Sequence, residues 1–183
     1  MLPNGVTLGN SIGIYCLMDI YGEPIYVGRT REKFATRIGK HLIKLRSDAV
    51  AHGVLDQNEV YEIRLYVIPK GTGDHARAEF TLSEDLIAQS RCRRLLNEKP
   101  IPKKPRIELP EPHRCVIIPA ELFEAFSNID TITAQRSESL AKINRTIADR
   151  NTKENHQLRE SALEKLRRLL DISNGVYGKP KLW

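Results

Sequence analysis

Residues 11–30, SIGIYCLMDIYGEPIYVGRT, and residues 31–46, REKFATRIGKHLIKLR, decide the fold of this chain. Apolar side chains alternate over residues 12–20, which predicts a β-strand, and the turn pair Tyr21-Gly22 leads into a second strand. From residue 31 apolar residues recur with helical spacing, at Phe34, Ile38, Leu42 and Leu45. This stretch therefore predicts a strand, a second strand and a helix.

Two tyrosines lie on the predicted hairpin. If the hairpin loop has an even number of residues, Tyr15 and Tyr26 project from the same face of the paired strands, and Ile25 and Val27 share the opposite face. On the helix that follows, Arg37 and His41 are four residues apart, so their side chains are neighbours. We expect His41 to lie between the apolar stripe and a basic flank.

The next segment predicts a third strand and a second helix. Apolar residues from Glu59 to Pro69 indicate a strand, which the sequence Gly71-Thr72-Gly73 ends. Asp74 is a suitable N-cap for a helix from His75 to about Cys92. Glu79 falls in the second turn of that helix.

The chain divides into three parts by composition. Residues 1–98 form a predicted compact domain. Residues 99–115 form a proline-rich basic arm, because five of the ten prolines lie between positions 100 and 112. Residues 116–183 are predicted to be mainly helical after a short strand at 116–118, with helices at 120–126 and 132–150 and a last apolar stripe at Leu158, Ala162, Leu166 and Leu169 or Leu170. A stripe this narrow packs either on the N-terminal domain or on a second subunit.

Composition limits the function classes. The net charge is +6 and the isoelectric point is about 9.3. Residues 22–46 and 91–106 each carry seven Lys or Arg, which suits a polyanionic partner or two solvated basic surfaces. No run of apolar residues is long enough to span a membrane, and no secretory signal is present. Three cysteines without a C-x-x-C pair fit a reducing cytoplasm.

The order of motifs resembles a known family. Gly13-Ile14-Tyr15, then Tyr26-Val27-Gly28, then Arg37, His41, Glu79 and Asn97 resemble the GIY-YIG nuclease family over about residues 11–98. The second motif has Val27 in place of isoleucine. The spacing from Glu79 to Asn97 is longer than usual, which leaves open whether Glu84 is the metal ligand and whether Asn97 is the structural asparagine of the family.

The resemblance implies an α+β fold, with a small three-stranded antiparallel sheet flanked by helices, followed here by a C-terminal helical region. It implies an endonuclease that hydrolyses DNA with one Mg²⁺ (or Mn²⁺) ion at Glu79. Its catalytic set is Tyr15, Tyr26, Arg37, His41 and Glu79. Tyr15 would act as general base or orient the water, and His41 would relay a proton or bind phosphate. Arg37 would bind the phosphate, and Tyr26 would bind the phosphate or the nucleophile.

Further cations and one amide are candidates for contacts with the DNA backbone: Arg29, Arg31, Lys33, Lys40, Lys44, Arg91, Arg94, Asn97, Lys103 and Lys104. Double-stranded DNA is the expected partner, although the residues do not exclude RNA. Cutting both strands favours a homodimer, for which the C-terminal stripes are candidates.

Two other hypotheses stay open. Each tyrosine alone is more typical of strand packing, and a basic domain with this fold would also suit a nucleic-acid binding module without catalysis. A helical interaction protein organised by residues 120–183 is a third hypothesis, which leaves the N-terminal motifs unexplained.

Overall fold

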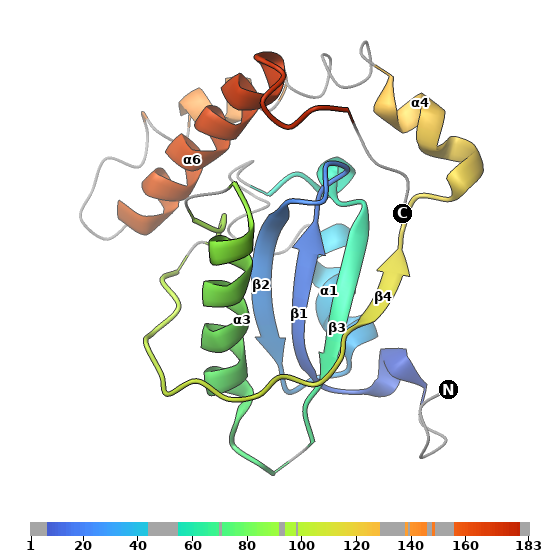
Figure 1. The fold of residues 1–183 in the computed structure, drawn as a ribbon, viewed down its shortest axis with the longest axis vertical. Helices are drawn as coiled ribbons and strands as arrows, with labels where there is room; N and C mark the ends of the chain where they lie inside the picture. Colours follow the sequence, from blue (N-terminus) through green and yellow to red (C-terminus); the bar gives the residue numbers. More distant parts are fainter. Residues whose placement is uncertain are drawn as a thin grey trace.

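The computed structural model describes residues 7–43, 55–69, 71–91, 94–97, 99–128, 138, 140–145, 148 and 156–179. Its centre is a four-stranded antiparallel sheet in the order β2-β1-β3-β4 (Figure 1). The strands are β1 (Gly13–Met18), β2 (Pro24–Thr30), β3 (Glu62–Val67) and β4 (His113–Val116). The α+β class is confirmed, and the predicted count of three strands is wrong by one.

Strand β4 comes from the end of the proline-rich segment. It pairs with β3 so that His113 lies opposite Leu65 and Val116 opposite Glu62. The sequence predicted a strand only at 116–118, because β4 is short, mostly exposed and free of alternation. The arm that precedes β4 lies along helix α3 (His75–Gln89). There the backbone N–H of Ile107 donates to Thr81 Oγ1 at 3.1 Å.

The β1–β2 hairpin is closed by Asp19. Its carboxylate accepts from the backbone N–H groups of Tyr21 and Glu23 at 2.9 and 2.8 Å. Pairing then shifts by one residue between Leu17 and Met18. Because of this bulge, Ile25 packs in the same core as Tyr26, while Val27 packs on the other side. The prediction that Ile25 and Val27 share one face is therefore wrong.

Two helices cover the sheet. Helix α1 (Phe34–Leu42) lies behind it and α3 (His75–Gln89) lies beside β2 (Figure 1). Side chains of β1 alternate between two cores, as predicted: Ile14, Cys16 and Met18 pack with α3, and Tyr15 and Leu17 pack with α1.

Each helix matches its prediction only in part. Helix α1 begins three residues later than expected, and residues 44–46, Lys44 among them, lie outside the described part. Helix α3 begins at His75 as predicted but ends at Gln89, before the expected end near Cys92, which itself lies outside the described part. Asp74 was expected to cap α3, but its backbone is already helical and its side chain makes no cap hydrogen bond. Its carboxylate instead accepts from Arg77 at 3.0 Å.

The C-terminal region begins with the short elements η3 (Ala120–Leu122) and α4 (Phe123–Ser127) and ends with α6 (His156–Ser173). Helix α6 buries Leu158, Ala162 and Leu169 in the core that contains Tyr15. The last apolar stripe therefore packs in the core that the N-terminal region contributes to. Among the helices within the described ranges, none has the length and apolar character to cross a membrane.

Candidate active site

Tyr15 and Tyr26 converge on the α1 face of the sheet. The register places Tyr15 opposite Gly28 and Tyr26 opposite Leu17, so the two tyrosines share one face. Their ring centroids are 6.1 Å apart and their planes differ by 25°. Tyr15 is fully buried and Tyr26 is 4% exposed. The shared face predicted from the sequence is confirmed.

Helix α1 brings His41 to this pair. The Tyr15 hydroxyl lies 2.7 Å from His41 Nε2, and the ring centroids of Tyr26 and His41 are 5.0 Å apart. His41 is fully buried, in line with Phe34 two turns earlier. It therefore belongs to the buried face of α1, and not to the border with the basic flank where the sequence predicted it.

The surroundings of His41 keep it neutral. Burial lowers its pKa to about 4, with a further lowering by the charge of Arg37. A neutral imidazole has one nitrogen that accepts a hydrogen bond and one that donates. Nδ1 is buried with no hydrogen-bond partner among the described residues. A neutral ring does not bind phosphate as a cation, which was one of the two roles expected for His41.

Glu79 lies on α3, next to the end of β2. Its Oε2 is 3.3 Å from Nε of Arg29, and its side chain is 12% exposed. Burial raises the pKa of Glu79, and the charges of Arg29 and Arg37 oppose that rise without cancelling it. Arg37 thus acts electrostatically on both His41 and Glu79, which joins the tyrosine–histidine cluster to the carboxylate.

The donor set at Glu79 fits a single hard cation. Burial raises the pKa of Glu79 more than the charges of Arg29 and Arg37 lower it, so a further cation beside it would stabilise the charged carboxylate. Within the described ranges no group of three His, Cys, Asp or Glu side chains is gathered. Mg²⁺ does not need such a group, because it keeps several waters and uses phosphate oxygens as ligands. Glu84, the alternative ligand, is exposed and lies about 140° further round the helix.

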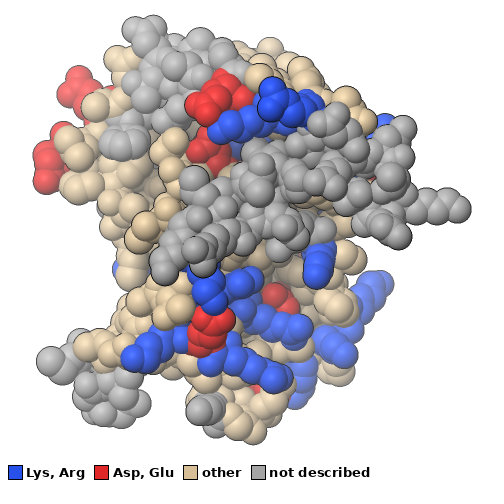
Figure 2. Space-filling view, turned by 180° about the vertical axis from the view of Figure 1, so that it is seen from behind, with Lys and Arg blue, Asp and Glu red and all other residues tan. Residues whose placement is uncertain are grey.

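Most of the expected phosphate-binding cations of the β2–α1 segment are accessible. Arg29, Arg31 and Lys33 are exposed, and Arg37 and Lys40 are partly exposed. Lys40 bonds both carboxylate oxygens of Glu32, at 2.9 and 2.7 Å. Figure 2 shows Lys and Arg side chains gathered on the face that carries α1, around a few acids.

The other expected DNA contacts lie apart from this group. Arg94 forms an ion pair with Glu160 of α6 at 3.1 Å, and the Arg91 guanidinium lies 5.9 Å from the centroid of the Tyr177 ring. Asn97 is 8% exposed, and its amide bonds the backbone of Val27. These contacts favour a structural role for all three. Lys103 and Lys104 are exposed on the arm.

One residue near the site was missed by the sequence analysis. His75 is four residues before Glu79 and is 7% exposed. Its pKa is lowered, mainly by burial and then by the charges of Arg31 and Arg29. The i, i+4 spacing to Glu79 was the available signal.

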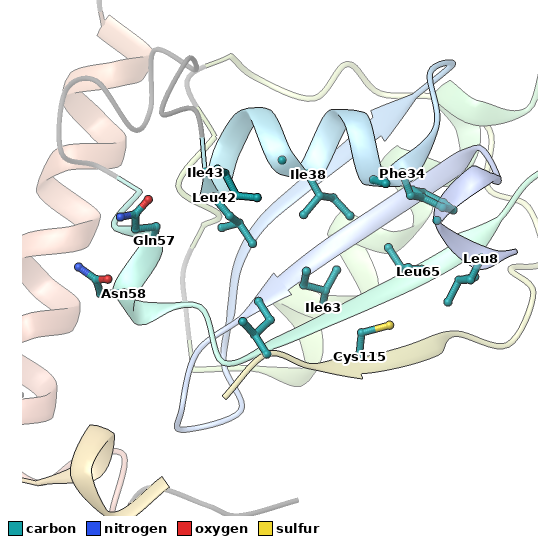
Figure 3. Close-up of a pocket in the computed structure, with 14 residues that line it drawn as sticks. Leu8, Phe34, Ile38, Leu42, Ile43, Gln57, Asn58, Ile63, Leu65 and Cys115 are labelled. Carbon is teal, nitrogen blue, oxygen red and sulfur yellow. The ribbon is translucent and has the colours of Figure 1, made fainter. Parts of the chain in front are cut away.

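A separate apolar groove lies between α1, β3 and β4 (Figure 3). It has a volume of about 670 Å³, and Ile38, Leu42, Ile63 and Leu65 line its centre. No acid or histidine lines it, and its one thiol, Cys115, has a pKa raised above the ordinary value, mainly by burial.

In comparisons with known proteins, no family model, curated protein or solved structure matches this chain.

Proposed function

We propose that this chain is a divalent-metal-dependent endonuclease of the GIY-YIG type that hydrolyses phosphodiester bonds in DNA. The observation that carries the proposal is the hydrogen bond of 2.7 Å between Tyr15 and His41, in a cluster that Arg37 couples to Glu79. Packing alone does not require a buried tyrosine hydroxyl bonded to a neutral histidine, or an arginine whose charge acts on both that histidine and a buried carboxylate.

Tyr15 and His41 would move the proton. As water attacks phosphorus, its proton passes to the Tyr15 oxygen, and the tyrosine proton passes to Nε2 of His41. In the free chain the charge of Arg37 helps to lower the pKa of His41. A phosphate bound to Arg37 would neutralise that charge, and the pKa of His41 would rise. Because burial is the larger cause of the low pKa, bound substrate would strengthen the relay in part.

The remaining residues would bind and stabilise. Arg37 and the half-exposed Arg29 would hold the phosphate oxygens as the bond to the leaving oxygen breaks. Glu79 would hold the metal ion. When bound, that ion supplies Lewis-acid stabilisation of the phosphoryl and leaving oxygens. Tyr26, beside His41, would orient the water or the phosphate.

The test is nicking of supercoiled plasmid with Mg²⁺ or Mn²⁺, against EDTA. We expect metal-dependent nicking by the native chain and none by Glu79→Ala. The exposed Glu84→Ala is the matched control and should cut normally. Equal nicking by Glu79→Ala, or none by the native chain, would refute the proposal. RNA and single-stranded DNA of the same sequence would define the substrate.

A second candidate is a nucleic-acid binding module without catalysis. Tyr15 and His41 are both fully buried, whereas Arg29, Arg31 and Lys33 are exposed, which suits binding through the surface alone. In that case DNA would bind in the plasmid assay and stay intact.

We also propose that the chain acts as a homodimer and in the cytoplasm. Since α6 buries its main stripe, a second copy would have to use its exposed Leu163 and Leu170.

A further inference from the structure

Strand β2 carries Tyr26 and Arg29 of the candidate site. β2 is the outer strand of the sheet, so one side of its backbone has no neighbouring strand. Residues 96–97 take that place. The backbone N–H of Leu96 donates to the Ile25 carbonyl at 2.8 Å. The Asn97 amide donates to the Val27 carbonyl at 2.6 Å, and its oxygen accepts from the Val27 N–H at 3.3 Å.

Helix α6 in turn holds Asn97. The hydroxyl of Ser161 donates to the Asn97 carbonyl at 2.7 Å, and the Gln157 amide donates to the same oxygen at 3.5 Å. The two donors are one helical turn apart, so they converge on one acceptor. Ser161 is fully buried, which shields its hydrogen bond from competition with water.

Other contacts fix α6 on the same side of the molecule. Leu158, Ala162 and Leu169 belong to the core that also contains Tyr15 and Tyr26. Lys165, buried in the structure, forms an ion pair with Glu59. Arg168 donates to the carbonyl of Pro24, the first residue of β2, at 2.5 Å. The contacts of α6 thus reach β2 both directly, at Pro24, and through Asn97.

We infer that α6 is a positioning element of the candidate active site. Ser161 fixes Asn97, and Asn97 fixes Val27, which lies between Tyr26 and Gly28. Ser161 touches no reacting atom, so it is a positioning residue. Its effect on cutting rests on the proposed function. A displacement of about 1 Å at such a site costs on the order of 100-fold in rate. Residues 1–98, which hold all the motifs, would then be incomplete without α6.

The test uses the full chain with Ser161→Ala, alone and with Gln157→Ala, which removes the second donor. Ser173→Ala is the control, because among the described residues that hydroxyl bonds the Leu169 carbonyl within α6, at 2.9 Å, and no residue of β2. Hydrogen exchange of the Val27 amide, followed by NMR, reports on β2 without any need for activity. Single-turnover cleavage at saturating DNA and the affinity for DNA report on the site.

We expect exchange at Val27 to become about 10-fold faster in the double variant, the effect of one lost hydrogen bond of ordinary strength. Cleavage should slow by about 10-fold at unchanged DNA affinity, and Ser173→Ala should match the native chain. Unchanged exchange at Val27, or faster exchange with normal cleavage, would overturn the inference. If the native chain cut no DNA, the proposed function would fail, and exchange would still decide whether α6 holds β2.

Discussion

The hydroxyl end of the Tyr15 ring lies against the backbone of Gly28, its partner across β1 and β2. A Cβ atom at position 28 would be 2.5 Å from both Cζ and Oη of Tyr15, a distance that side chains do not tolerate. The glycine therefore sets how close the Tyr15 hydroxyl comes to β2, and with it the 2.7 Å contact to His41.

Gly28→Ala should displace the Tyr15 hydroxyl from His41. We expect a loss of about 1–3 kcal/mol in the free energy of unfolding, as for an overpacked core. Plasmid nicking should fall on the order of 100-fold, as for a misplaced catalytic group. Gly39→Ala is the control, because a Cβ there meets nothing within 4 Å. Equal stability and nicking in the two variants would contradict this reading of Gly28.

His41 should titrate far below an ordinary histidine. Its ring protons, followed by NMR in the free chain, should report a pKa of about 4. Burial is the larger cause and Arg37 the smaller, so Arg37→Gln should raise the pKa only part of the way to 6.5. A native value near 6.5 would show that the ring is solvated, and the relay with Tyr15 would lose its basis.

The same shift links His41 to stability. The unfolded chain binds the proton more readily than the folded chain between pH 4 and 6.5, so the free energy of unfolding rises with pH across that window. Neutral His41 contributes fully above pH 6.5, by roughly 2–3 kcal/mol relative to pH 4. Urea unfolding should show a steeper rise of stability with pH in the native chain than in His41→Gln, where the lowered pKa of His75 still contributes in the same direction.

Patterns within single segments of the sequence predicted the strands and helices whose buried faces recur with a regular spacing. Alternation gave the two faces of β1, and helical spacing gave α1 and α3. Two features leave no periodic trace: the bulge beside Met18 and the fourth strand at 113–116. The apolar stripe of α6 was visible as helical spacing, but the spacing could not decide between the N-terminal domain and a second subunit, because that choice depends on contacts between distant segments. His41 was misplaced for the same reason, because the core that buries it includes side chains of the sheet.

For the candidate site, motif order predicted which residues belong together but not what each one touches. Arg94 resembles a phosphate ligand in the sequence, yet Glu160, 66 positions later, takes its guanidinium. Asn97 likewise serves β2 through Val27. The exposed cations Arg29, Arg31 and Lys33 were predictable, because they directly follow the Tyr26-Val27-Gly28 motif in the sequence.

The edge of the sheet away from the site depends on Glu62. It is 1% exposed and accepts from Arg114 at 2.6 and 2.8 Å and from Arg64 at 2.9 Å. Burial alone would raise the pKa of Glu62, but the hydrogen bonds from Arg114 and Arg64 outweigh it and hold the pKa below its usual 4.5. This stabilisation is therefore complete above pH 4.5 and is lost as the pH falls below it.

Glu62→Gln should lower the free energy of unfolding by about 2 kcal/mol at pH 7, since charge-assisted hydrogen bonds are lost in a buried position. It should also flatten the fall in stability below pH 4.5. Glu32→Gln, which removes an exposed ion pair with Lys40, should change little. A Glu62→Gln chain as stable as Glu32→Gln in urea unfolding would show that the Arg114 pair does not hold β4.

The exposed cations of the β2–α1 segment should set the salt dependence of DNA binding. Arg31 and Lys33 are exposed, whereas Arg94 is paired with Glu160. Each phosphate contact contributes a slope of about 0.9 in log affinity against log salt, so Arg31→Ala with Lys33→Ala should reduce the slope by about 1.8. Fluorescence anisotropy in EDTA measures this slope without cutting the DNA. Salt between about 50 and 200 mM changes the affinity by roughly 10-fold or more, which is enough to determine the slope.

Arg94→Ala is the control for that measurement, because it removes one positive charge from the net total at a site away from this segment, whereas the double variant removes two. It should leave the slope unchanged, since its guanidinium bonds Glu160 at 3.1 Å and serves the contact with α6. A slope that fell by about 0.9 in Arg94→Ala, half the fall in the double variant, would mean that net charge alone governs binding. DNA would then have no preferred path over the face that carries α1, and the approach of a phosphate to Arg37 would lack its electrostatic guide.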